Sequence, residues 1–215
     1  MNIVYEDDHI VVAYKEANIL TQSSESGEKG LLEELSEHYQ QKLHLIHRLD
    51  RAVSGLLVFA RTSKAAAILS NSLSSDDFVK EYYALVYGTL EEQEGILEDL
   101  LYKDARAKKA YVVKRERNGV KKAKLAYKVE KTLDQLSLIH IHLYTGRFHQ
   151  IRVQFSSRGL PLVGDGKYGA KDHEKRIALC AYHLSFKHPI TKKPLDFQLD
   201  IQQEDIFRKY LTQIR

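Results

Sequence analysis

Residues 96–144 read ILEDLLYKDARAKKAYVVKRERNGVKKAKLAYKVEKTLDQLSLIHIHLY, and this stretch decides the class of fold. It contains four runs of strand length, either apolar or alternating between apolar and polar residues, with short polar turns between them. One turn holds the dipeptide Asn118–Gly119, which is favoured in two-residue hairpins. The stretch therefore predicts an antiparallel meander over residues 95–145.

On the N-terminal side of the meander, short strands are mixed with short helices. Thr62 or Ser63 is suited to cap the second helix, because a side-chain hydroxyl can accept a hydrogen bond from the first turn. The expected elements are two strands within residues 2–20, a helix over 31–43, a strand over 55–60, a helix that begins near 62 and a strand over 79–90.

On the C-terminal side, a helix is predicted from about Phe148 to Ser157, with Gly159 ending it. Two strands over 178–190 and 193–200 and a helix over 204–214 complete the chain. Helices and strands do not alternate regularly, which predicts an α+β fold with a largely antiparallel sheet. No repeat or Pro-rich linker divides the sequence, so residues 1–215 are predicted to form a single domain.

The composition is that of an ordinary globular protein. Of 215 residues, 43% are hydrophobic and 29% are charged, which excludes a disordered chain, collagen and a disulfide scaffold. Cys180 is the single cysteine, and no leader precedes the first strand, so a cytoplasmic protein is expected. No apolar run approaches the roughly 20 residues of a membrane helix, so no membrane partner is expected. A monomer is the default expectation.

Positive charge is concentrated in one segment. Residues 102–131 contain twelve Lys and Arg and three acids, a net charge of +9, which leaves −5 on the rest of a chain whose total is +4. Such a basic surface indicates a polyanionic partner, with nucleic acid first. The alternative is a solvated charged face.

Two motifs contain candidates for chemistry. Asp50 in IHRLDRAVSG lies between Arg48 and Arg51, whose charges favour the ionised carboxylate and make it available as a nucleophile or base. Arg147 and Arg152 in TGRFHQIRVQ lie at a predicted helix start that suits a phosphate or carboxylate. The alternatives are a turn aspartate with ordinary ion pairs and a basic surface helix.

Histidines provide a rival interpretation. His140 and His142 alternate on a predicted strand and so share a face, and with His149 they would make a histidine metal site. No cysteine or acid stands at a recognised zinc spacing, which favours ordinary strand histidines and no metal.

Taken together, the ordered motifs of nearly the whole chain resemble the RluA-type RNA pseudouridine synthases. The similar segments are IVYEDDHIVV, HRLDRAVSGLLVFAR, KEYYALVYG, TGRFHQIRVQF with GLPLVGDGKYG, and LCAYHLSFKHPIT. The resemblance implies the pseudouridine synthase fold, a mixed central sheet with flanking helices and a catalytic cleft.

The resemblance also implies roles for particular residues. Asp50 would be the catalytic aspartate, Tyr82 would pack against the target base, and Arg152 would pair with Asp50 and keep it ionised. Arg48 would face the RNA near the flipped nucleotide, and Ile151 would form part of the apolar wall. His47 and Leu49 would be structural.

Three departures from the family pattern stand out. Glu16 and Asn18 occupy the positions of the usual proline and glycine in a Lys-Pro-x-Gly loop, and Gln154 stands where many members have histidine. The sequence starts almost directly at the catalytic domain without an S4-like RNA-binding module. Substrate choice is therefore expected to come from the domain itself, including the basic segment 102–131.

The implied activity is isomerisation of specific uridines in ribosomal or transfer RNA, an RNA-processing reaction that needs neither metal nor organic cofactor. A loop or bulge uridine is the expected target, because the base must leave its stack. The alternative is a catalytically inactive RNA-binding protein of the same fold.

Overall fold

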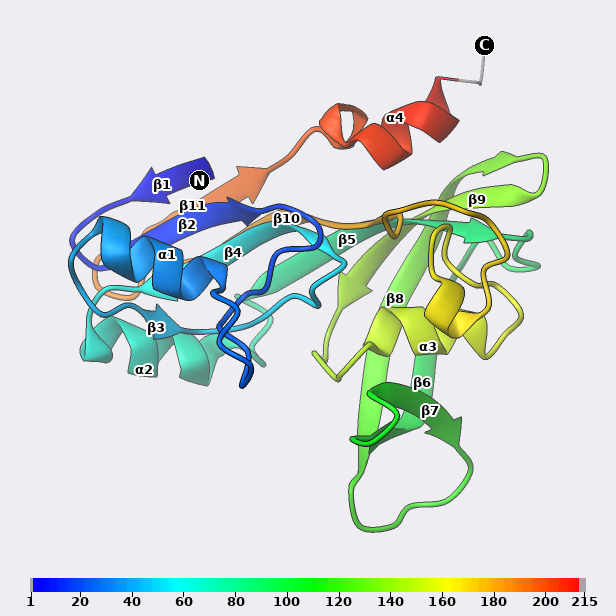
Figure 1. The fold of residues 1–215 in the computed structure, drawn as a ribbon, viewed down its shortest axis with the longest axis horizontal. Helices are drawn as coiled ribbons and strands as arrows, with labels where there is room; N and C mark the ends of the chain where they lie inside the picture. Colours follow the sequence, from blue (N-terminus) through cyan, green and yellow to red (C-terminus); the bar gives the residue numbers. More distant parts are fainter. Residues whose placement is uncertain (1, 213–215) are drawn as a thin grey trace. The chain divides into compact units, whose positions relative to one another are not determined.

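The computed structural model describes residues 2–212, with the backbone alone at Leu133. Apart from the two-residue strand β3 (His44–Leu45), which was not predicted, the strands and helices follow the predicted order, and the fold is α+β (Figure 1). The chain divides into two compact units. Unit 1 holds the residues up to Lys80 together with Ala181–Leu199, and unit 2 holds Glu81–Cys180 together with the residues from Asp200 onward. The assignment of residues 1–215 to a single domain stays a prediction.

Unit 1 contains a sheet in the order β1-β2-β4-β10, with β3 also paired to β4 and β11 to β10. The pairs β1–β2, β2–β4, β3–β4 and β10–β11 are antiparallel. The elements are β1 (Asn2–Glu6), β2 (Ile10–Lys15), α1 (Leu31–His38), β3 (His44–Leu45), β4 (Ser54–Ala60), α2 (Ser63–Ser72), β10 (Leu179–Lys187) and β11 (Pro194–Gln198).

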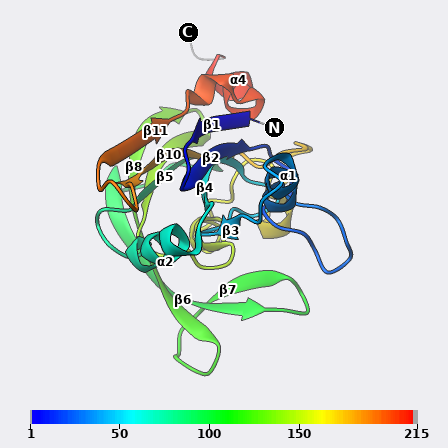
Figure 2. The same ribbon diagram turned by 90° about the vertical axis from the view of Figure 1, so that its left-hand side faces the viewer.

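The core of unit 1 forms where α2 covers β3 and β4 (Figure 2). Ala65 and Leu69 of the helix belong to one buried cluster with Val12 and Val58 of the sheet. Burial of a side chain such as Leu69 contributes about 1.5–3 kcal/mol. Thr62 caps the helix as predicted, because its hydroxyl accepts the N–H of Ala65 at 3.2 Å.

Gly55 of β4 marks a close approach of two backbones. Its φ is +131°, and a Cβ at this position would lie 2.3 Å from the carbonyl oxygen of Ala181. No side chain fits there, which explains a glycine at the start of an otherwise apolar strand.

Unit 2 contains a sheet in the order β5-β9-β8-β6-β7, and each of these pairs is antiparallel. The elements are β5 (Val79–Tyr87), β6 (Glu94–Asp104), β7 (Lys109–Val113), β8 (Val120–Leu133), β9 (Leu136–Leu143), α3 (Gln150–Ser156), the 3-10 turns η1 (Gly166–Tyr168) and η2 (Ile201–Gln203), and α4 (Asp205–Leu211). The last helix was predicted to reach 214, and residues 213 and 214 lie outside the described part of the chain.

The predicted meander is antiparallel, but its strand order differs from sequence order. β6 lies between β7 and β8, so the Asn118–Gly119 turn joins two strands that are not neighbours. The connection spans residues 114–119, and Gly119 has a φ of +84°. Alternation of apolar and polar residues identifies strands without specifying which strands pair, which is why a two-residue hairpin was expected here.

None of the helices in residues 2–212 combines the length and the apolar character that crossing a membrane requires.

Candidate active site

The loop between β3 and β4 in unit 1 carries the predicted catalytic aspartate. Leu49 and Val53 are buried on either side of it, whereas Arg48 is exposed and Asp50 is half-buried. The N–H of Val53 donates to the carbonyl oxygen of Asp50 at 3.0 Å, which closes a tight turn. The apolar residues anchor the loop, and the polar residues between them are left nearer to solvent.

Hydrogen bonds to the backbone fix the loop on both sides of Asp50. The Thr21 hydroxyl donates to the carbonyl oxygen of Leu49 at 2.9 Å and accepts the N–H of Leu49 at 3.2 Å. Lys15 is fully buried, and its ammonium donates to the carbonyl oxygens of Ile19 at 2.7 Å, Glu16 at 2.9 Å and Arg51 at 3.1 Å. Both residues adjacent to Asp50 in sequence are thereby held.

The two arginines that flank Asp50 have different environments. Arg51 pairs with Glu28, with its Nη2 at 2.8 Å from Oε1, and its Nε donates to the carbonyl oxygen of Asn18 at 3.1 Å. Within residues 2–212, Arg48 forms no salt bridge with an acid. Of the two charges that the sequence placed beside Asp50, Arg51 is therefore shared with Glu28, and Arg48 faces solvent.

His47 begins the motif as a neutral side chain. Its Nε2 accepts the N–H of Val58 at 3.4 Å, and its ring packs edge-on against Phe78 with centroids 5.8 Å apart. Desolvation, with the nearby charge of Lys80, lowers the pKa of His47 to about 3. The structural role expected for His47 agrees with these contacts.

Tyr82 lies in the middle of β5 in unit 2, opposite Ile141 of β9. Its side chain is 6% exposed. The contact of Tyr82 with a target base stays a prediction.

The motif TGRFHQIRVQ forms a turn followed by α3. The helix begins at Gln150, two residues later than predicted, because His149 has a left-handed backbone with a φ of +53°. The side-chain oxygen Oε1 of Gln150 accepts hydrogen bonds from the Thr145 hydroxyl at 2.8 Å and from the N–H of Arg147 at 3.0 Å. It also donates to the carbonyl oxygen of Lys124 at 3.1 Å. Gln150 thus ties the turn to β8, a role that sequence reasoning did not assign.

Arg152 is 5% exposed and forms a two-point ion pair with Asp165. Its Nε lies 2.7 Å from Oδ2 and its Nη2 lies 2.8 Å from Oδ1. The guanidinium also lies over the ring of Tyr168, 5.0 Å from its centroid. No role was predicted for Asp165 from the sequence, so this partner was missed. The expected pairing of Arg152 with Asp50 stays a prediction.

The two remaining predicted site residues of unit 2 differ in burial: Ile151 is buried and Arg147 is exposed. Ile151 is 5% exposed and lies beside Arg152 on α3. Arg147 precedes the helix, is exposed, and donates from Nε to the carbonyl oxygen of Lys122 at 2.8 Å. Arg147 lies just before the helix, as the predicted start at Phe148 implied, but the helix begins two residues later.

The three histidines of the rival metal site make other contacts. His140 and His142 each lie 3.4 Å from a carboxylate oxygen of Glu81, and Nδ1 of His149 lies 2.9 Å from the Tyr168 hydroxyl. Over residues 2–212, no group of three or more His, Cys, Asp or Glu side chains is arranged to hold a metal ion. The structure gives no support to a metal site built on these residues.

Comparisons with known proteins place the chain in a family. A family model described as RNA pseudouridylate synthase matches residues 9–157. The uncharacterized RNA pseudouridine synthase YhcT of Bacillus subtilis is 35% identical, over 89% of this chain and 65% of its own length. The ribosomal large subunit pseudouridine synthase D of Zymomonas mobilis is 33% identical, over 95% of this chain and 70% of its own length.

Two further proteins extend the likeness. The dual-specificity RNA pseudouridine synthase RluA of Vibrio vulnificus is 31% identical over 94% of this chain and 86% of its own length. Among solved structures, the human RNA pseudouridylate synthase domain containing 4 has the same fold, with a TM-score of 0.78 at 22% identity over 100% of this chain and 93% of its own. The chain spans about two thirds of YhcT. On the family match, this chain belongs to the RNA pseudouridylate synthase family.

Proposed function

We propose that this chain is an RNA pseudouridine synthase, an isomerase that converts uridine in structured RNA to pseudouridine. The observation that carries the proposal is the family match over residues 9–157, which includes Asp50, Tyr82 and Arg152. The fold alone would not suffice, since one fold can host unrelated functions.

Asp50 is proposed as the catalytic group. The reaction breaks the bond between N1 of uracil and C1′ of ribose, and a new bond then joins C5 to C1′. The carboxylate of Asp50 either attacks C1′, forming an ester bond that breaks when C5 attacks C1′, or removes a sugar proton to give a glycal and returns that proton as C5 bonds to C1′. The proton on C5 is lost and N1 gains one, so product and substrate have the same formula. Isomerisation involves no redox change and no donated group, so no cofactor is required.

Arg152 is proposed to keep Asp50 ionised. Asp165 takes two of the five N–H donors of the guanidinium, and the planar group can present its other edge to a second carboxylate. A nearby positive charge favours the ionised form of Asp50. Asp165 would then set the orientation of Arg152.

The other predicted residues are proposed to bind substrate. Tyr82 would pack against the uracil, and Ile151 would form part of the apolar wall that prevents the detached base from escaping. Arg48 and Arg147 are exposed cations suited to phosphate contacts.

The proposed substrate is ribosomal or transfer RNA, with a loop or bulge uridine as target. Flipping the base costs a few kcal/mol, and the cost is smallest where the base is unpaired. Relatives named as ribosomal large subunit pseudouridine synthases favour ribosomal RNA. We further propose that the protein acts in the cytoplasm as a monomer.

The test is a pseudouridine map of total RNA from cells with and without the gene, followed by conversion assays on the sites that change. We expect the map to lose one or a few sites. The normal protein should restore them, and Asp50→Asn should not, although it should still bind the RNA.

Asp76→Asn is the matched control, because it makes the same chemical change at an exposed position of unit 1. It should restore every site. Normal turnover by Asp50→Asn would overturn the assignment of the catalytic group. RNA binding by the wild-type protein without conversion of any uridine would show an inactive RNA-binding protein instead.

A further inference from the structure

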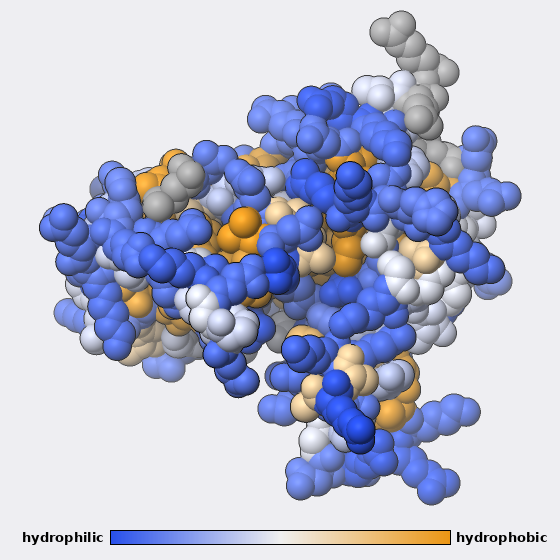
Figure 3. All heavy atoms as spheres, viewed as in Figure 1, coloured by the Kyte–Doolittle hydropathy of each residue, from blue (hydrophilic) through white to orange (hydrophobic). Residues whose placement is uncertain are grey.

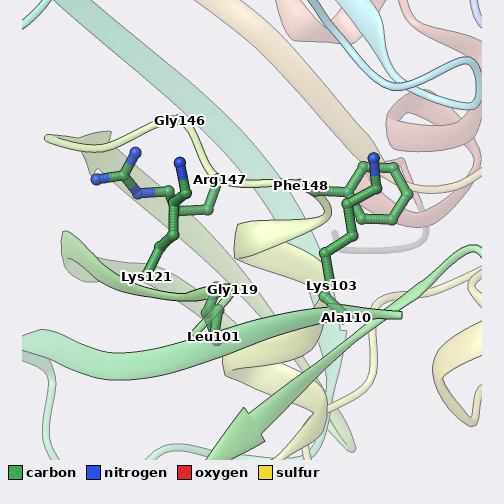
Figure 4. A pocket seen from close by; sticks show the side chains of 8 residues that line it. All are labelled: Leu101, Lys103, Ala110, Gly119, Lys121, Gly146, Arg147 and Phe148. Atoms are coloured by element: carbon green, nitrogen blue, oxygen red, sulfur yellow. The ribbon is translucent and has the colours of Figure 1, made fainter. Parts of the chain in front are cut away.

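A pocket of about 250 Å³ lies within unit 2, between the β6–β7 hairpin, the start of β8 and the turn before α3 (Figure 4). Leu101 and Ala110 belong to its apolar floor. Lys121 and Arg147 stand on one side, and Lys103 and Phe148 stand on the other. The surrounding hairpin surface is mostly hydrophilic (Figure 3).

The strand register explains why these side chains share one face. Leu101 of β6 is paired with Lys121 of β8, and Lys103 of β6 is paired with Ala110 of β7. Alternate residues of a strand point to the same side, so both lysines stand on the face that bears Leu101 and Ala110. Leu101 and Ala110 are buried in a cluster with residues of α3 and η1, which fixes the floor.

The cations of this pocket lack the acidic partners that neighbouring lysines have. In the part of the chain from 2 to 212, no acid forms a salt bridge with Lys103, Lys121 or Arg147. By contrast, Lys124 pairs with Glu98 at 2.8 Å and Lys128 with Glu130 at 3.5 Å on the same strand, β8. Like charges gathered around one pocket repel each other, and a bound anion would relieve that repulsion.

Phe148 provides an aromatic surface that is already fixed. Its ring stacks on His149 with centroids 3.8 Å apart and planes 20° from parallel. His149 is held by the Tyr168 hydroxyl, which accepts the N–H of Ala110 at 2.7 Å. The ammonium of Lys103 lies 4.8 Å from the centre of the Phe148 ring. An aromatic face beside several cations matches a base with its phosphate.

We propose that this pocket binds one nucleotide of the substrate RNA other than the target uridine. Lys121 and Arg147 take the phosphate, and the base lies on the Phe148 face that the ammonium of Lys103 now covers, so Lys103 moves aside when the base binds. The volume is below the roughly 300–1,000 Å³ of pockets for drug-sized ligands, so the pocket takes a single nucleotide at most. The proposal rests on the proposed function, since it assigns the RNA a second point of attachment.

The test measures the salt dependence of RNA binding in the Asp50→Asn background, where turnover does not interfere. The probe is a fluorescein-labelled RNA stem-loop with a uridine-rich loop, and its Kd is measured by anisotropy at low and high salt. Each phosphate contact contributes a slope of about 0.7–0.9 to log Kd against log salt. A fourfold rise in salt raises the Kd of the parent. For Lys121→Gln or Arg147→Gln, the same rise in salt should raise Kd by a factor about threefold smaller.

Phe148→Leu separates stacking from charge. It should raise Kd by about tenfold at every salt concentration, because stacking on an aromatic ring does not release counterions. Lys128→Gln is the charge control on β8, and Tyr111→Leu is the aromatic control on β7. Neither control should change the slope, and Tyr111→Leu should leave Kd within twofold.

Three results overturn the proposal. One is a slope for Lys121→Gln and Arg147→Gln equal to that for Lys128→Gln. Another is a Kd for Phe148→Leu equal to that for Tyr111→Leu. The third is uridine monophosphate, titrated by NMR, filling the pocket as tightly as the RNA, which would identify a mononucleotide site.

Turnover by the chain with an intact Asp50 is measured separately. If it fails while the slopes change as expected, the proposed function fails and the pocket stands. If the chain turns over RNA but the salt slopes of Lys121→Gln and Arg147→Gln equal that of the parent, the pocket proposal alone is rejected.

Discussion

Lys15 in unit 1 and Arg152 in unit 2 are buried cations, and the two find their hydrogen-bond partners in different ways. Lys15 of unit 1 is fully buried and donates to three backbone carbonyl oxygens. Arg152 of unit 2 is 5% exposed and forms a two-point ion pair with the carboxylate of Asp165.

The difference lies in what each cation fixes. The carbonyl groups held by Lys15 belong to residues 16, 19 and 51, so the ammonium joins a loop of the backbone to the residue after Asp50. The pair of Arg152 and Asp165 fixes the direction of a side chain, because the guanidinium fork matches a carboxylate only in certain planar arrangements. Lys15 therefore positions the backbone that bears Asp50, whereas the ion pair with Asp165 fixes the orientation of the Arg152 guanidinium itself.

The largest effect on stability should come from breaking the ion pair. Asp165→Ala leaves the Arg152 guanidinium buried without that carboxylate, and loss of one partner of a buried pair costs about 3–5 kcal/mol. Urea unfolding measures the change in the free energy of unfolding, and conversion of RNA should fall with it because Arg152 loses its orientation.

A double-mutant cycle controls this prediction. Arg152→Met combined with Asp165→Ala should cost less than the sum of the two single changes, because no charge is then left from this pair. Glu91→Ala alters an exposed acid of unit 2 and should change stability by less than about 0.5 kcal/mol. If the change in the free energy of unfolding for the double variant equalled the sum of the two single changes, the ion pair would contribute nothing to stability.

A smaller loss is expected when Lys15 is removed. Lys15→Met keeps the length of the side chain and leaves three carbonyl oxygens without this donor. We expect a loss of about 2–3 kcal/mol, since each buried unsatisfied group costs about 1–3 kcal/mol and water can reach part of the loop. The kcat should fall more than the KM for RNA changes, because the position of Asp50 is affected rather than RNA binding.

Lys42→Met is the control for this change, since Lys42 is exposed in the same unit. It should leave stability and kcat within experimental error of the parent. A Lys15→Met protein with normal kcat would show that the loop around Asp50 is held without the ammonium.

The comparison also shows what the sequence could predict. The fold class, the order of elements and the cap at Thr62 follow from local patterns, because periodicity and capping involve neighbouring residues. The family was recognised from ordered motifs. Arg152 was selected within such a motif, and it is buried on α3.

Two partners, Asp165 for Arg152 and the carbonyl group of Arg51 for Lys15, could not be predicted because neither is a near neighbour in sequence. Asp165 lies thirteen residues after Arg152, in the segment GLPLVGDGKYG, outside any helix or strand that the sequence predicts. Lys15 stands at the end of a strand, where a lysine is ordinarily solvated, and the three carbonyl groups that bury it come together only in the folded chain. The order β8-β6-β7 likewise depends on tertiary pairing that alternation does not encode.

Acid should distinguish the two regions further, since His47 precedes the Asp50 turn and is desolvated. Its pKa lies at about 3 in the folded protein against an ordinary 6.5, so protonation favours the unfolded chain. The contribution of neutral His47 to the free energy of unfolding is fully present above pH 6.5 and is lost as the pH falls toward 3. Between pH 7 and pH 5 we expect the free energy of unfolding to fall by about 2 kcal/mol. Urea unfolding across this range should show the slope, and His47→Gln, which can still accept the N–H of Val58, should flatten it. His38→Gln removes an exposed imidazole and should keep the slope. An equal slope in His47→Gln and the parent would assign the acid sensitivity to other groups and leave the Asp50 loop insensitive to pH.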